Sequence, residues 1–320
     1  MSASANRPSL RAVRRACFAA ALLSAAALLA GCGSGGAASS SGKILAVGAE
    51  NEYANVISQI GGSYVQTTAI ESNPNTDPHT FEASPSVAAT VAEAHLVVQN
   101  GLGYDGYMEK IEAASGGAGS DSTRKVIDVR KLLGLPDSTP NPHLWYKPQT
   151  MPAVAAAVAR DLSDIDPAHA AYFKANAERF ERSLQPWLVA LRQFESRHPG
   201  VAVATTEPVG DYMLEAAGTR NLTPFSLQAD IMNGTDPSPQ DVAYQSSLFS
   251  AHKVNVFVYN QQVTDSLTET FLKEAAANGI PVVGVYETMP TPGYDYQSWM
   301  LAEVKALEAA VAEKVSTRKL

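Results

Sequence analysis

The sequence predicts an α/β protein made of two lobes, each with a mostly parallel sheet flanked by helices, joined by one long spine helix. Short apolar runs of strand type alternate with amphipathic helical segments in the first half, and the same alternation restarts near residue 200. Between the halves lies a helical stretch without strands. Strands that alternate with helices form βαβ units around parallel sheets. About 280 residues beyond the export signal also suit two domains.

The N-terminal lobe is expected over residues 43–150. Ser84 is a candidate helix cap, with Pro85 at the first helical position. The predicted strands cover residues 43–47, 64–70, 96–98 and 125–129, and the predicted helices cover residues 51–60, 85–94 and 104–113. Residues 115–122 are rich in Gly and Ser and are the only part of the body with low complexity.

Residues 151–199 are expected to link the lobes through helices over 151–162 and 168–197. In the second of these, apolar residues recur at helical spacing from Tyr172 to Phe194. A helix of about 30 residues is about 45 Å long at 1.5 Å per residue, long enough to run along both lobes. Pro186 lies inside this segment and predicts a kink, because proline cannot complete the helical hydrogen bonding.

The C-terminal lobe is expected over residues 200–320. Ser238 and Pro239 again form a helix start, and Gly279 ends a later helix. The predicted strands cover residues 201–205, 254–259 and 280–285, and further helices are predicted over 212–217, 265–278 and 296–315.

The N-terminal segment has the pattern of an export signal rather than of a folded element. Four arginines precede an apolar run over residues 18–30, which is of signal-peptide length. The run ends in Leu29-Ala30-Gly31-Cys32, which resembles a bacterial lipoprotein cleavage site with Cys32 as the lipidated residue. An ordinary signal peptide followed by a chance cysteine is the alternative. Residues 32–42 contain mostly Gly, Ala and Ser and predict a flexible tether.

Charge and cysteine content narrow the possible ligands. Without residues 1–31, which hold four arginines and no acids, the chain has 20 basic and 32 acidic residues, a formal charge of −12. This argues against nucleic acid as a partner, because its binding needs basic surface. The body has no cysteine, since Cys17 and Cys32 precede it. Metal ligands in the body would therefore be His, Asp or Glu.

Two histidines occur in similar surroundings far apart in the sequence. His79 lies in Asn75-Thr76-Asp77-Pro78-His79-Thr80, and His143 lies in Asn141-Pro142-His143-Leu144-Trp145. Each follows a proline, which fixes φ and favours extended geometry in the preceding residue. Two such loops can present imidazole ligands to one metal ion. The alternative is two unrelated surface histidines.

The ends of the predicted strands supply further candidate ligands. His79 follows the second strand of the first lobe, and His143 follows the last one. Glu207 comes directly after the strand over residues 201–205, and Glu287 after the strand over residues 280–285. Open parallel sheets bind ligands outside the carboxyl ends of their strands. Two solvated loop carboxylates are the alternative for the two glutamates.

Together these segments resemble the zinc- and manganese-binding solute-binding proteins of bacterial metal ABC transporters. The resemblance extends from Lys43 to the closing helix. Three motifs carry it: Asp77-Pro78-His79-Thr80-Phe81-Glu82 with Ser84-Pro85-Ser86, Asn100-Gly101-Leu102-Gly103, and Asn141-Pro142-His143-Leu144-Trp145.

The resemblance implies a set of four metal ligands. His79 and His143 match the two histidine segments of the family. Glu207, five residues before Tyr212, takes the place of the third ligand, which is His or Glu in the family. Glu287 takes the place of the fourth ligand, which is usually Asp, and so departs from the family pattern.

The sequence leaves the identity of the metal open between zinc and manganese. Two imidazoles and two carboxylates can give four-coordinate Zn²⁺, whereas a bidentate carboxylate would suit Mn²⁺ or Fe²⁺. Zinc-specific relatives often carry a His-rich loop between the histidine segments, and residues 115–122 contain no histidine. A given N/O site nevertheless binds Zn²⁺ more tightly than Mn²⁺. Lys147 stands where the family usually has an acid, so the surroundings of His143 are expected to differ.

The leading hypothesis is a lipid-anchored receptor outside the cytoplasm that captures one divalent zinc or manganese ion between its lobes. It would deliver the ion to the permease of an ABC importer, act as a monomer and need no catalytic group. The alternative from another class is a secreted metallohydrolase, whose site would keep one metal position open and need a general base. A third reading is a binder of an organic solute, with His79 and His143 as hydrogen-bond donors.

Overall fold

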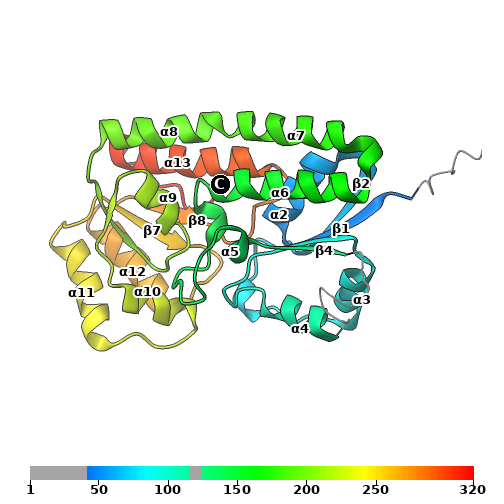
Figure 1. Cartoon of the computed structure of the whole chain (residues 1–320). Helices are drawn as coiled ribbons and strands as arrows, with labels where there is room; N and C mark the ends of the chain where they lie inside the picture. Colours follow the sequence, from blue (N-terminus) through cyan, green and yellow to red (C-terminus); the bar gives the residue numbers. More distant parts are fainter. Residues whose placement is uncertain (1–41, 115–123) are drawn as a thin grey trace, which may run out of the picture. The chain divides into compact units, whose positions relative to one another are not determined.

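The computed structural model describes residues 42–114 and 124–320. The predicted signal peptide, Cys32 and nearly all of the predicted tether lie outside these residues. Among the helices of the described residues, none is both long and apolar enough to span a membrane. Residues from Lys43 onward form one compact unit, whose helices and strands are drawn in Figure 1.

The first half of this unit contains a four-stranded parallel sheet in the order β2-β1-β3-β4. Its strands are β1 (Ile44–Glu50), β2 (Val65–Glu71), β3 (Leu96–Gln99) and β4 (Lys125–Asp128). The helical elements of this half are α2 (Asn51–Gly61), η1 (Gly62–Tyr64), η2 (Pro78–Thr80), α3 (Pro85–Glu93), α4 (Gly106–Ala114), α5 (Val129–Leu132), η3 (Leu144–Tyr146) and α6 (Thr150–Ile165).

The second half repeats this arrangement with a parallel sheet in the order β6-β5-β7-β8. Its strands are β5 (Ala202–Thr205), β6 (Arg220–Asn221), β7 (Val256–Asn260) and β8 (Val282–Val285). Its helices are α9 (Asp211–Ala216), α10 (Phe225–Met232), α11 (Pro239–Ser250), α12 (Ser266–Ala277) and α13 (Tyr296–Glu313). The two parallel sheets confirm the predicted fold class, while the predicted lobe boundaries at residues 150 and 199 stay predictions.

The long helix predicted between the sheets is present as a bent pair. η4 (Pro167–His169) leads into α7 (Ala170–Ser183), and α8 (Gln185–Arg197) follows after Leu184. Pro186 is the second residue of α8 and has no N–H to donate to the preceding turn, so the hydrogen-bond ladder is interrupted there. In Figure 1, α7 and α8 run along the top of the molecule. α7 packs on α2 and α6, and α8 packs on α13.

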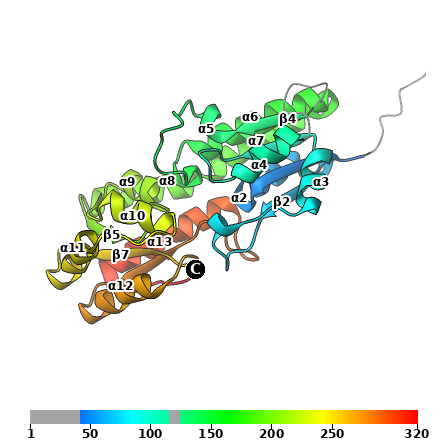
Figure 2. The same ribbon diagram turned by 90° about the horizontal axis from the view of Figure 1, so that it is seen from below.

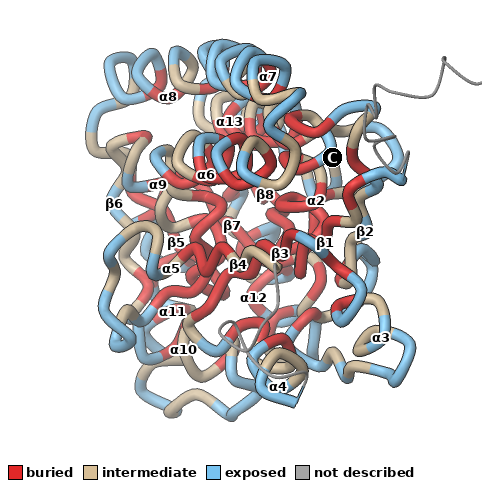
Figure 3. The backbone as a smooth tube through the Cα atoms, turned by 45° about the vertical axis from the view of Figure 1, so that its right-hand side comes forward, coloured by how far each residue is buried: buried red, intermediate tan, exposed pale blue. Residues whose placement is uncertain are grey.

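One hydrophobic core is shared by both sheets and the helices that pack on them. It contains Val98 from the first sheet, Val203 and Val283 from the second, and the fully buried Trp187 and Trp299 from the bent pair and the closing helix. Figure 3 shows buried backbone in strands of both sheets. Two smaller cores each belong to a single sheet. Their helices are α3 and α4 beside the first sheet and α10, α11 and α12 beside the second (Figure 2).

Local sequence signals explain where several helices begin. The Ser84 side chain accepts a hydrogen bond from Val87 N, and the Ser238 side chain accepts one from Asp241 N, as the predicted caps require. β6, with only two residues, and α10 were not predicted from the sequence. A two-residue strand has too little alternation to be recognised without its neighbour β5.

We expect the Trp299→Ala substitution to lower the free energy of unfolding by about 3–5 kcal/mol, because it empties a fully buried site in the shared core. Trp299 also packs edge-on against Tyr146 and Tyr296. Denaturant titration of the metal-free protein measures the loss. Phe225→Ala is the control, because Phe225 is 42% exposed. Equal losses in the two variants would contradict the assignment of Trp299 to the core.

Candidate metal-binding site

Three side chains from both sheets converge on one point. His79, His143 and Glu287 each offer a ligand atom, and these atoms lie within 4.8 Å of one another, the only such group among the described residues. Nε2 of His79 is 3.1 Å from Oε2 of Glu287, and Nε2 of His143 is 3.2 Å from the same oxygen. His79 follows β2, His143 follows β4 and Glu287 follows β8. The site thus lies at the carboxyl ends of the strands, where open parallel sheets bind ligands.

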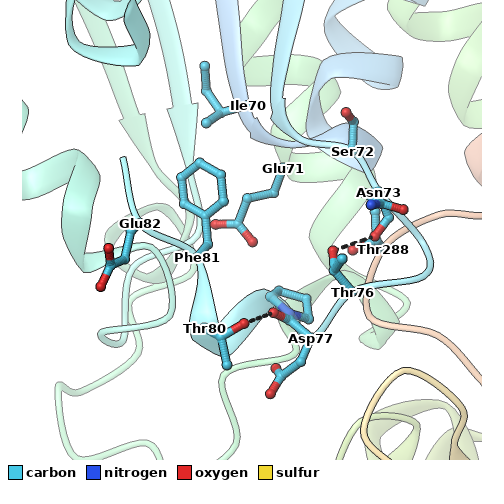
Figure 4. Close-up of a pocket in the computed structure, with 11 residues that line it drawn as sticks. Ile70, Glu71, Ser72, Asn73, Thr76, Asp77, Thr80, Phe81, Glu82 and Thr288 are labelled. Atoms are coloured by element: carbon cyan, nitrogen blue, oxygen red, sulfur yellow. Dashed lines mark hydrogen bonds between the residues drawn. The ribbon is translucent and has the colours of Figure 1, made fainter. Parts of the chain in front are cut away.

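His79 is held in place by hydrogen bonds within its own loop. The backbone N–H of His79 donates to Oδ1 of Asp77 at 2.8 Å. The hydroxyl of Thr80 donates to Asp77 O at 2.8 Å, and the hydroxyl of Thr76 donates to Asn73 O at 3.1 Å. Figure 4 shows this loop beside a cavity. The His79 side chain is 23% exposed, whereas those of His143 and Glu287 are fully buried, so the site opens to solvent on the His79 side.

The cavity beside the His79 loop has a volume of about 360 Å³. Glu71, Asp77, Phe81 and Thr288 are among the residues that line it (Figure 4). None of the four ligands predicted from the sequence lines this cavity. It therefore adjoins the metal-binding group without containing it.

Asn141 fixes the orientation and the tautomer of His143. Oδ1 of Asn141 accepts a hydrogen bond from the backbone N–H of His143 at 3.0 Å and lies 2.8 Å from Nδ1 of the ring. Because this oxygen is already an acceptor for the backbone, the neutral ring must carry its proton on Nδ1. Nε2 then presents a lone pair toward Glu287. Metal-binding histidines are oriented by hydrogen bonds of this kind, and here the amide oxygen of Asn141 makes the bond.

The two oxygens of Glu287 have different surroundings. Oε2 accepts a hydrogen bond from the hydroxyl of Tyr104 at 2.9 Å and faces both imidazoles. Oε1 accepts one from Nδ2 of Asn260 at 2.5 Å. The backbone N–H of Glu287 donates to Oε1 of Gln262 at 2.6 Å, which fixes the loop after β8. A lone pair of neutral His143 faces Oε2, so a cation at this point would relieve the repulsion between the two lone pairs.

Burial and the three charges shift the pKa values within this group. Burial raises the pKa of Glu287, but the neighbouring imidazoles of His143 and His79 outweigh it and hold the pKa below its usual value. Burial lowers the pKa of His79, but Glu287, Asp77 and Glu71 more than offset it and the pKa is raised. The pKa of His143 is lowered, mainly by burial. Without metal, protonation of His79 is therefore favoured over protonation of His143.

Glu207, the remaining predicted ligand, lies near the group but does not belong to it. It follows β5 and is buried. Nδ2 of Asn260 donates to Oε1 and to Oε2 of Glu207, each at 3.3 Å. Burial raises the pKa of Glu207 well above its usual value, and the charge of Glu287 adds to this effect. The structure thus brings three of the four predicted ligands together and places Asn260 between the fourth and Glu287.

Four further acids are buried in the first half near this site: Glu50, Glu52, Glu71 and Asp105. Burial is the main cause that raises their pKa values, to about 8 for Glu71 and about 7 for Asp105. Glu287 differs from these four acids, because its pKa is depressed.

Sequence reasoning did not identify Asn260, Gln262 or Tyr104 as parts of the site. Asn260 is the last residue of β7. The rule that ligands bind at the carboxyl ends of strands could therefore have indicated Asn260. Tyr104 lies directly after the glycine turn at Gly101 and Gly103, and only its contact with Glu287 reveals its role.

The fold defines a class of protein: an α/β protein of the two-lobed solute-binding type, with its group of candidate metal ligands at the carboxyl ends of strands from both sheets. The chain matches the family model described as zinc-uptake complex component A, periplasmic, over residues 47–310. It belongs to this family.

Relatives of the chain are named for different metals. It is 30% identical over 169 residues to the manganese-binding lipoprotein MntA of Bacillus subtilis. This alignment covers 52% of the chain and 55% of the relative. It is 21% identical over 226 residues to the iron-binding protein YfeA of Yersinia pestis. This alignment covers 70% of the chain and 71% of the relative. The match thus spans only about half the length of the Bacillus relative.

A solved structure has the same fold. The Mn-bound periplasmic metal binding protein from Candidatus Liberibacter asiaticus superposes with a TM-score of 0.68 at 18% identity, covering 84% of this chain and 100% of that one. At this identity the likeness concerns the fold alone.

We expect metal affinity to fall as pH is lowered through the raised pKa of His79, because only the neutral imidazole binds metal. The raised pKa means that the fall begins at a higher pH than for an ordinary histidine, whose pKa is about 6.5. Competitive titration between about pH 5 and pH 8 measures the profile. Asp77→Asn keeps an oxygen that can accept the hydrogen bond from the His79 backbone but removes a charge that raises the pKa of His79. The fall in metal affinity of this variant should therefore occur at lower pH. An affinity that stays constant over this window would contradict histidine ligation.

Proposed function

We propose that this protein is the extracytoplasmic binding component of an ABC importer for a divalent transition metal, zinc or manganese. It captures one ion between the two sheets and delivers it to the permease. The observation that carries the proposal is the convergence of Nε2 of His79, Nε2 of His143 and Oε2 of Glu287 within 4.8 Å. The family match supports it.

The chemistry of capture follows from the charges of the metal-free site. The incoming ion replaces the direct contact between His79 and Glu287 and takes up the lone pair of His143 that Asn141 orients. Glu207 becomes the fourth ligand when it gives up its two long hydrogen bonds from Asn260. Two imidazoles and two carboxylates then hold the ion, a set that suits zinc and accommodates manganese.

Release to the permease requires the two halves to separate, because hydrogen bonds join the ligand-bearing loops of each half to the other half. Nε2 of Gln262 donates to Thr76 O at 2.8 Å, which ties the loop before His79 to the end of β7. Nδ2 of Asn141 donates to Pro208 O at 2.7 Å, which ties the His143 loop to the loop after β5. Neutral hydrogen bonds of this kind each contribute about 1 kcal/mol, so a docking partner can break them.

The protein acts as a carrier and not as an enzyme, since its family is one of transport proteins. A hydrolytic metal site would need an open position for water and a nearby general base. Here the fourth position falls to Glu207.

We also infer that Cys32, which lies outside the described residues, carries the lipid that anchors the protein outside the cytoplasm. We further infer that the protein is a monomer. The formal charge of −12 that we infer for the mature chain leaves no role for nucleic acid.

We expect His143→Ala to lower metal affinity by more than the roughly 10- to 100-fold that changes outside the ligand shell cause. The substitution removes a fully buried ligand. Elemental analysis of the purified protein and competitive titration with Zn²⁺ and Mn²⁺ measure the change. His252→Asn is the control, because His252 is exposed and has a positive φ, which Asn adopts readily. Equal metal content in the two variants would refute the proposal.

We expect Glu207→Gln to weaken binding and to change the preference between Zn²⁺ and Mn²⁺, because it removes a carboxylate ligand. Glu215→Gln, at an exposed position of α9, makes the same change in charge away from the site. Titration of both variants with each metal separates the two effects. If affinity and preference are the same in Glu207→Gln as in the unaltered protein, Glu207 is not a ligand.

A further inference from the structure

Asn260 stands between the two glutamates because of the order of the strands. β7, which ends at Asn260, lies between β5, which precedes Glu207, and β8, which precedes Glu287. Its side chain is 1% exposed and donates to Oε1 of Glu287 at 2.5 Å. The same Nδ2 makes only two long contacts, at 3.3 Å, with Glu207.

The amide of Asn260 cannot turn over without losing hydrogen bonds. Its Oδ1 accepts the backbone N–H of Gln262 at 3.0 Å, so this atom must be the oxygen and Nδ2 must face the carboxylates. The backbone N–H of Asn260 donates to the hydroxyl of Thr206 at 2.9 Å, which fixes the end of the strand. The donor aimed at Glu287 is therefore a built feature of the fold.

We propose that Asn260 is a specificity-determining residue that allows Glu287 to present only one oxygen, Oε2, to the metal ion. This inference rests on the proposed function. Oε2 faces both imidazoles, whereas Oε1 is held by Asn260 on its other side. A bidentate Glu287 would have to give up this hydrogen bond and leave the buried Nδ2 without its short partner, which is unfavourable.

The restriction bears on the choice of metal. With one oxygen from Glu287, one from Glu207 and two imidazole nitrogens, the ion has four protein ligands, the number that Zn²⁺ prefers. With both oxygens of Glu287, the number rises to five, which is closer to the higher coordination that suits Mn²⁺. Asn260 thus disfavours Mn²⁺ relative to Zn²⁺.

The test uses the full chain, loaded separately with Zn²⁺ and with Mn²⁺. In Asn260→Ala we expect the ratio of the Mn²⁺ to the Zn²⁺ dissociation constant to fall by about tenfold or more, the scale of changes around metal ligands. X-ray absorption at the zinc edge should show one more oxygen ligand in the variant than in the unaltered protein. A ratio within about twofold of the original, in a variant that unfolds at the same temperature, would overturn the inference.

Tyr104→Phe is the matched control, because Tyr104 donates to the other oxygen of the same carboxylate. Oε2 coordinates the ion in either case, so the two affinities should change in parallel and leave the ratio unaltered. A shift of the ratio as large as in Asn260→Ala would overturn the inference.

The unaltered protein alone provides a second test, which holds even if Asn260→Ala does not fold. A zinc shell with five or more ligands in the unaltered protein, including both oxygens of Glu287, would refute the restriction. If the unaltered protein binds neither metal, the proposed function itself fails. If it binds metal but the ratio does not respond to Asn260→Ala, only the present inference fails.

Discussion

The buried carboxylate of Glu287 is the interaction on which the rest of the site depends. An ionised carboxylate that is taken out of water is very costly unless it is paired and hydrogen-bonded. Here the partners come from the whole molecule: two imidazoles and a tyrosine from the first half, and an amide from the neighbouring strand. The partners of this carboxylate are thus complete only while the two halves are together, which would link the proposed capture of the ion to the closed arrangement.

The connections between the halves are of two kinds. Around the site they are single hydrogen bonds, such as those of Gln262 and Asn141, which are weak and can be exchanged. Behind the sheets they are apolar contacts of the bent helix pair and the closing helix within one shared core. Burial of apolar surface contributes more to stability than these single hydrogen bonds do. The halves can therefore separate at the ligands while they stay joined at the helices.

Much of this arrangement could be predicted from the sequence, because the signals are local. Alternating strands and helices indicated both sheets, and the prolines before His79 and His143 indicated their loops. Glu287 could be named from its position after a buried strand. Asn260 could not, because its partners are set by the order of β5, β7 and β8, which is a property of the tertiary structure. The distance of Glu207 from the metal-binding group also depends on that order. The helix breaks at Leu184, two residues before Pro186, where the sequence predicted a kink, since Pro186 acts on the turn before it.

The shared core has a consequence for how such a protein can be altered. The two sheets have the same strand order and look like interchangeable modules, yet the helices that pack on them, α2 and α6 on the first sheet and α13 on the second, share one hydrophobic core. Either half produced alone would leave Trp187 or Trp299 without part of its surroundings and expose an apolar face to water. Recombination between relatives at the loops joining the halves would therefore have to preserve the packing of α8 on α13 as well as the ligands. The contact that matters for exchange is this helix packing and not only the group of candidate ligands.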